Sequence, residues 1–244
     1  MGISGTEVSK EASDIVLLDD SFSTITRAIK WGRGIYKNFQ RFIQFQLTVN
    51  LSSVSVVLIS VLAGLKVPFT ALQLLWVNII MDGPPALTLG LEKPSKNLMH
   101  EKPTQRNASI VSMGMLFQIL TNGLYICVFF MAQYFWNFMN IPQEQQPTVL
   151  FTLFIVFQLF NAFNSRELGV KSVFKHLGGN VLMVGVFTLT FGLQILITQF
   201  GGSFFDTVPL SLSSWIKILA SGAGILVFSE ILKLFRRLIH LRRS

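Results

Sequence analysis

The chain has 244 residues, of which 51% are hydrophobic and only 13% are charged, and its mean hydropathy is +0.55. Soluble domains carry about 25% charged residues, so this composition excludes an ordinary soluble protein and predicts an integral membrane protein. The net charge of +8 is typical of basic cytoplasmic loops and does not indicate nucleic-acid binding.

The first segment, residues 1–41, is less apolar than the rest of the chain. The run 14–20 alternates little and ends in acids, which predicts a short buried strand. A helix is predicted to begin near Phe22–Thr26, and no clear breaker interrupts it before the first apolar run, so it continues as a stalk. A lone strand and helix cannot form a core. We therefore expect an α/β remnant of a larger cytoplasmic domain that lies upstream.

Six stretches are apolar enough and long enough to cross a bilayer, because a spanning helix needs about 20 mostly apolar residues. They lie near 42–64, 70–91, 112–136, 148–165, 180–199 and 212–232. The sequence therefore predicts an all-α, six-helix membrane domain over 42–232, followed by a basic tail at 233–244.

The basic residues predict the orientation of these spans. If all six cross the membrane, 18 of the 20 Lys and Arg residues fall on one side, and only Lys66 and Lys217 fall on the other. Because basic loops stay in the cytoplasm, both termini are predicted to be cytoplasmic. The segment 232–243 is basic and amphipathic, so it can act as a positive-inside anchor or bind calmodulin or anionic lipid.

Asp82 is an acid inside the apolar run of the second predicted span. A carboxylate at membrane depth costs roughly 2.5–3.5 kcal/mol, and such groups usually face a pathway or a partner. Pairing with a buried cation is the alternative, but no Lys, Arg or His lies in the middle of another span. Pro84 and Pro85 follow closely, and their missing N–H groups break the helix and free carbonyls upstream.

Amide and hydroxyl side chains accompany this acid. Asn78 precedes Asp82 by one turn and shares its helical face, and the first predicted span presents Gln46, Asn50 and Ser53 on one face. Taken alone, such residues are also typical of hydrogen bonds between helices. Two neighbouring spans that turn amides inward, one with a carboxylate, instead favour a cation site.

The fourth predicted span adds Gln158, Asn161 and Ser165 on one face, where packing and ion ligation are equally compatible with the pattern. All the candidate ligands are oxygens, which suit hard cations such as Ca²⁺, Mg²⁺, Mn²⁺, Na⁺ or K⁺. Ca²⁺ takes six to eight oxygens, more than these side chains supply. Further ligands, including a second acid, are expected from helices upstream of residue 1.

Several motifs resemble the type II P-type ATPases, specifically the calcium pumps. The ion motif at 76–86 is the most specific, and 161–165 is similar to the eighth-helix pattern of the family. Residues 33–38 resemble the stalk of the fifth helix, and 1–14 resemble the end of the phosphorylation domain. The resemblance implies that the six spans are helices five to ten of a pump.

The resemblance further implies that Asn50, Asn78 and Asp82 ligate a single ion, with Ser53 and Gln158 as secondary candidates. Sarcoplasmic-type pumps carry acids at the positions of Ser53 and Gln158. Because this chain has uncharged residues there, the resemblance implies one ion per cycle. Residues 45–50 look like plasma-membrane-type pumps. Residues 81–86 are closer to the secretory-pathway type, which also carries Mn²⁺. The host membrane is thus the plasma, vacuolar or secretory-pathway membrane.

The family's phosphorylated Asp, nucleotide-binding domain and actuator loop are not in this sequence. The resemblance implies a Ca²⁺-transporting ATPase in which ATP and Mg²⁺ act through an N-terminal remainder, whereas this polypeptide alone should not hydrolyse ATP. The alternative is a separately encoded membrane fragment that assembles with, or inhibits, a full-length pump. The reading frame upstream of Met1 distinguishes the two.

Overall fold

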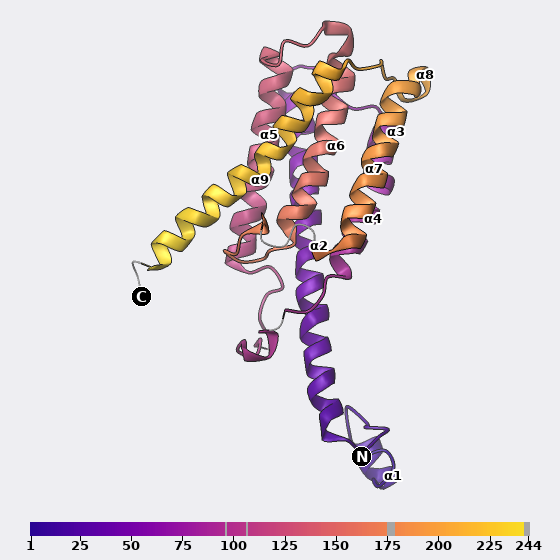
Figure 1. Cartoon of the computed structure of the whole chain (residues 1–244), viewed down its shortest axis with the longest axis vertical. Coiled ribbons are helices and arrows are strands. Elements are labelled where there is room, and N and C mark those ends of the chain that lie inside the picture. Colours follow the sequence, from indigo (N-terminus) through magenta and orange to yellow (C-terminus); the bar gives the residue numbers. More distant parts are fainter. Residues whose placement is uncertain (96, 106, 175–178, 242–244) are drawn as a thin grey trace. The chain divides into compact units, whose positions relative to one another are not determined.

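The computed structural model describes residues 1–95, 97–105, 107–174 and 179–241, without the side chains of 239–241. The chain forms two compact units. Unit 1 comprises Met1–Asn38 and Lys93–Ala108, and unit 2 comprises Phe39–Glu92 and Ser109–Ser244. Throughout the described residues the regular structure is helical (Figure 1).

Unit 1 contains α1 (Glu7–Glu11), the first part of α2 (Phe22–Leu62) and the short η2 (Leu98–His100). The Asp20 carboxylate organises the turn at the start of the chain. It accepts hydrogen bonds from the Ser4 hydroxyl and from the N–H groups of Gly2, Ile3 and Ser4. These bonds, the Ser4 hydroxyl foremost, lower the pKa of Asp20 to about 2.

The predicted buried strand at 14–20 is wrong. Its residues form no strand, and Ile15 and Leu18 are 72% and 83% exposed. A strand needs a neighbour for its backbone groups. Within the described residues, its backbone meets that of Gly2, whose N–H donates to the Leu17 carbonyl at 2.7 Å. The predicted helix near Phe22–Thr26 and its continuation into the first apolar stretch are confirmed, because α2 begins at Phe22 and runs unbroken to Leu62.

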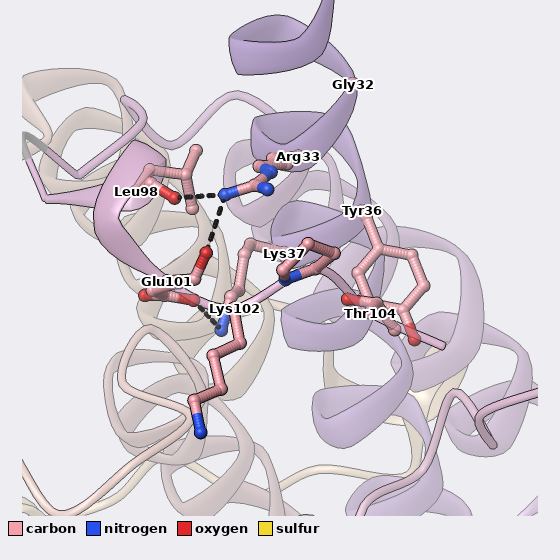
Figure 2. Close-up of a pocket in the computed structure, with 9 residues that line it drawn as sticks. Gly32, Arg33, Tyr36, Lys37, Leu98, Glu101, Lys102 and Thr104 are labelled. Carbon is pink, nitrogen blue, oxygen red and sulfur yellow. Dashed lines mark hydrogen bonds and ion pairs between the residues drawn. The ribbon is translucent and has the colours of Figure 1, made fainter. Parts of the chain in front are cut away.

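A loop of unit 1 is fastened to α2 by charged side chains (Figure 2). Arg33 Nη1 donates to the carbonyls of Leu98 and Glu101 at 3.0 and 2.9 Å, and Lys37 Nζ lies 3.0 Å from the Glu101 carboxylate. They border a cleft of about 240 Å³. The cleft is lined by Gly32, Arg33, Tyr36, Lys37, Leu98, Glu101, Lys102, Pro103 and Thr104, and none of the predicted ion ligands is among them.

Unit 2 holds the remaining helices. They are the rest of α2, then α3 (Ala71–Trp76), η1 (Val77–Met81), α4 (Gly83–Gly90), α5 (Met113–Trp136), η3 (Gln143–Gln145), α6 (Gln146–Ser165), α7 (Val181–Phe200), α8 (Gly202–Phe205) and α9 (Leu212–Leu241). Five described helices are long and apolar enough to cross a membrane: Phe22–Leu62, Met113–Trp136, Gln143–Ser165, Val181–Phe200 and Leu212–Leu238. The span predicted at 70–91 is divided among α3, η1 and α4.

The centre of unit 2 is α6, which packs against α5, α7 and α9 (Figure 1). Every side chain from Thr148 to Leu159 is buried, as expected of a helix that is apolar on all sides. The contact with α9 is the closest, because Gly222 leaves no room for a side chain. A Cβ there would lie 2.4 Å from Val156 Cγ1. Small residues allow this kind of approach between membrane helices.

The basic tail predicted at 233–244 begins as part of a helix, since α9 continues to Leu241. Lys233 Nζ lies 3.2 Å from Glu230 Oε1 one turn earlier on the same helix. The tail also contacts α5, because the Arg236 guanidinium lies 5.4 Å from the centre of the Phe117 ring. Residues 242–244 lie outside the described residues, and calmodulin or lipid binding by this segment stays a prediction.

Candidate cation-binding site

The broken helix that carries Asp82 has an identifiable cause for each of its parts. A capping box of Thr70 and Gln73 starts α3. At η1 the chain takes a π-helical turn, in which Asp82 N–H donates to the Val77 carbonyl at 2.9 Å. A new helix, α4, then begins with Pro84 and Pro85 in its first turn, where a missing N–H costs least. The predicted break is confirmed, and it begins before Asp82.

The two prolines leave a backbone oxygen beside Asp82 without a helical donor. The Ile80 carbonyl would accept from Pro84 in an α-helix and from Pro85 in a π-helix, and neither residue has an N–H. The next available amide, of Ala86, donates to the Asp82 carbonyl at 3.1 Å. π-Turns inside α-helices are frequent at functional sites, and this one immediately precedes Asp82.

Asp82 itself is only 2% exposed, and its Oδ1 atom has no hydrogen-bond partner among the described residues. A buried carboxylate oxygen is costly unless a donor or a cation meets it. The residues present therefore fit an oxygen-seeking cation.

The two predicted asparagine ligands lie elsewhere on the surface of unit 2. Asn50 on α2 and Asn78 on η1 are both exposed, whereas Asp82 is buried. Ser53 is half-buried, and its hydroxyl donates to the Asn50 carbonyl at 3.1 Å. In the described residues no group of three or more His, Cys, Asp or Glu side chains could hold a metal ion. The structure thus does not join Asn50, Asn78 and Asp82 into a closed ligand shell.

The polar residues in the second half of α6 are buried, and their hydrogen-bonding groups have different partners. Gln158 Nε2 donates to Ser52 Oγ at 3.2 Å, and Asn164 Nδ2 donates to the Ile225 carbonyl at 3.3 Å, so both residues join helices. Neither side-chain atom of Asn161 has a partner in the described part of the chain. Sequence reasoning missed Gln118 and Asn122 on α5, although their spacing of four residues was visible. Both are buried, and their side-chain oxygens have no partner among the described residues.

Comparison with known proteins matches residues 66–235 to the family described as "Cation transporting ATPase, C-terminus". The chain belongs to this family. It is 42% identical over 217 residues to calcium-transporting ATPase 12, plasma membrane-type, of Arabidopsis thaliana, covering 88% of this chain and 21% of the relative. It is 37% identical over 245 residues to human plasma membrane calcium-transporting ATPase 3, covering 95% of this chain and 20% of that relative. The chain therefore spans about a fifth of the length of these relatives.

In this cation transporting ATPase segment, a second polar cluster joins the ends of α4, α6 and α7. Arg166 contacts Glu92 through two hydrogen bonds, of 2.8 and 3.1 Å, and Asn180 Nδ2 donates to Glu92 Oε2 at 2.9 Å. Arg41 Nε donates to the Arg166 carbonyl at 2.7 Å, which adds α2. Burial raises the pKa of Glu92, but the bonds from Arg166 and Asn180 outweigh it and hold the pKa below its ordinary value.

This cluster was not predicted from the sequence, because the charged residues between the apolar runs were used only to predict the orientation of the spans. The structure allows a test. Replacing Glu92 by Gln keeps a similar shape but leaves the Arg166 guanidinium, which is 4% exposed, without its carboxylate. Breaking a buried ion pair in this way costs about 3–5 kcal/mol. We expect the thermal midpoint of the detergent-solubilised protein to fall by roughly 10 °C.

The matched control is Glu101→Gln, which removes the solvent-accessible pair with Lys37 in unit 1. Exposed ion pairs contribute about 0–1 kcal/mol, so the midpoint should move by no more than a few degrees. Equal midpoints for the two variants would show that the Glu92 pair has no special structural role.

Proposed function

We propose that this chain is the C-terminal membrane part of an ATP-driven calcium pump of the plasma-membrane type and that it supplies one cation site centred on Asp82. The observation that carries the proposal is that the buried Asp82 Oδ1 atom has no partner among the described residues, in a helix that is interrupted by a π-turn and followed by two prolines. The relatives are named calcium-transporting ATPases, which supports Ca²⁺ as the transported ion. Five described helices of the chain are long and apolar enough to cross a membrane, which supports a site at membrane depth.

The proposed ligands of the transported ion are the Asp82 carboxylate, the Ile80 carbonyl and the amide oxygens of Asn50 and Asn78. Ca²⁺ requires six to eight oxygens, so other parts of a longer protein must complete the shell. The exposure of Asn50 and Asn78 is consistent with this, because both side chains remain accessible to a further helix. Ser53 and Gln158 are uncharged, which favours one ion per cycle over two.

Transport would follow from a change in the affinity of this site. Both termini are proposed to lie in the cytoplasm, where ATP and Mg²⁺ act on domains outside this chain. Phosphorylation there would move α2, which is continuous from unit 1 to Asn50. Withdrawal of a ligand would lower the affinity for Ca²⁺ and release the ion on the far side of the membrane.

The test is phosphoenzyme formation from ATP in the full-length protein, titrated separately with Ca²⁺ and Mn²⁺. One site predicts a Ca²⁺ dependence with a Hill coefficient of about 1. Equal activation by Mn²⁺ would instead favour the secretory-pathway type, and a Hill coefficient near 2 would contradict the single site. Phosphorylation that needs neither ion would overturn the proposal.

A further inference from the structure

Gln194 of α7 lies at the centre of a buried hydrogen-bond network. The residue is 0% exposed, and its Oε1 atom accepts from Trp76 Nε1 at 3.2 Å. Its Nε2 atom donates to Thr198 Oγ1 at 3.1 Å and to Thr152 Oγ1 at 3.4 Å. The three contacts give both polar atoms of this amide a partner within an apolar helix bundle. The network joins α3, α6 and α7.

The partner of Gln194 has a special place in the chain. Trp76 is the last residue of α3, and the π-turn η1 begins at the next residue. Its ring also packs edge-on against Phe205, with the ring centres 5.5 Å apart, and Gln73 Nε2 donates to the Phe205 carbonyl at 2.9 Å. The half of the broken helix before the π-turn is therefore attached to α7 and α8 by polar side chains.

The half after the π-turn is attached as well. Asn180, which caps α7, donates to the Thr88 carbonyl of α4 at 3.3 Å and to Glu92 at 2.9 Å. Between these two attachments lies η1 with the exposed Asn78. Two residues thus hold the two ends of the segment that carries the proposed ligands. They are Asn180, which caps the start of α7, and Gln194 farther along that helix.

Holding the ends of this segment in place affects its conformation, because a π-turn competes with an ordinary α-helical turn. Changing the register by one residue rotates every following side chain by about 100° and shifts it by about 1.5 Å along the axis. Such a change would re-aim Asn78 and Asp82 together. The prolines set the start of α4, but they do not set where α3 must end.

We propose that Gln194 is a positioning residue that holds Trp76 and thereby selects the π-turn register in which Asn78 and Asp82 face the transported ion. The proposal rests on the function proposed above for these two residues. The network around Gln194 is separate from the ion ligands, so it can be altered without removing a ligand.

The first experiment measures Ca²⁺-dependent phosphoenzyme formation in the full-length protein. Gln194→Leu removes the acceptor, and Trp76→Phe removes the indole N–H while it keeps an aromatic ring. Each variant should raise the Ca²⁺ concentration for half-maximal phosphorylation about 5- to 10-fold, and the double variant should do no more than either alone. The maximal phosphoenzyme level should stay unchanged. The control is Thr198→Val, which removes a different contact of Gln194 and should leave the Ca²⁺ dependence as it is.

A second measurement reads the register without relying on transport. In a Cys127→Ala background, which removes the chain's single cysteine, Asn78→Cys reports the accessibility of η1 to a water-soluble maleimide. Gln194→Leu should change the labelling rate several-fold, whereas Thr198→Val should not.

The two measurements separate the failure of each idea. An unchanged labelling rate together with an unchanged Ca²⁺ dependence would overturn the role of Gln194. A changed labelling rate in a protein whose phosphorylation needs no ion would leave the register role intact and remove the proposed function. Equal effects of Gln194→Leu and Thr198→Val on labelling would reduce Gln194 to general packing and overturn the proposal.

Discussion

Ca²⁺-dependent phosphorylation from ATP is expected to disappear when Asp82 is replaced by Asn in the full-length protein. The substitution is nearly isosteric, so the close packing around this buried residue is preserved while its charge is lost. Removing one partner of a buried charge pair costs about 2–5 kcal/mol, which corresponds to a loss of Ca²⁺ affinity of about 30-fold to a few thousand-fold. The measurement is phosphoenzyme formation over a Ca²⁺ titration.

Asp206→Asn provides the matched control for this result. Asp206 is an exposed acid that follows α8, so its neutralisation should leave the Ca²⁺ dependence unchanged. Phosphoenzyme that still requires Ca²⁺ at the original concentration in the Asp82 variant would remove Asp82 from the ligands of the ion.

Loss of the folded protein is the expected result of a Gly222→Leu substitution in α9. A Cβ at this position would lie 2.4 Å from Val156 Cγ1 and 3.0 Å from Phe160 Cδ2, and both neighbours belong to the central helix α6. Overpacking a tight contact typically costs 1–3 kcal/mol and here forces two helices apart, so most of the stability should be lost. The measurement is the yield and thermal midpoint of monodisperse protein in detergent.

The contrast variant is Gly185→Leu on α7, where an added Cβ would meet no atom within 4 Å. Leucine has a higher helix propensity than glycine, so this variant should be as stable as the parent or more stable. If Gly222→Leu had the same midpoint as Gly185→Leu, the close approach of α6 and α9 would not contribute to stability.

The predictions that were confirmed depend on the solvent around a segment and on the chemistry of residues close together in the sequence. Apolar runs of spanning length became helices, because a backbone in lipid must satisfy its own hydrogen bonds. The break near Asp82 was predictable from the prolines, because proline lacks an N–H group in any tertiary structure. The strand at 14–20 failed for the opposite reason, since a strand depends on a distant neighbour that the local sequence does not reveal.

By itself, the sequence determined the membrane class, the apolar spans, an acid inside an apolar run and the broken helix beside it. Only the tertiary structure decided which polar groups meet. It buried Asp82 with no described partner for its Oδ1 atom while leaving Asn78 exposed, and it brought Gln194 to Trp76 and Arg166 to Glu92 across 118 and 74 residues of chain. Helix periodicity predicts which residues share a face, but the neighbour of each face depends on how the helices pack against one another.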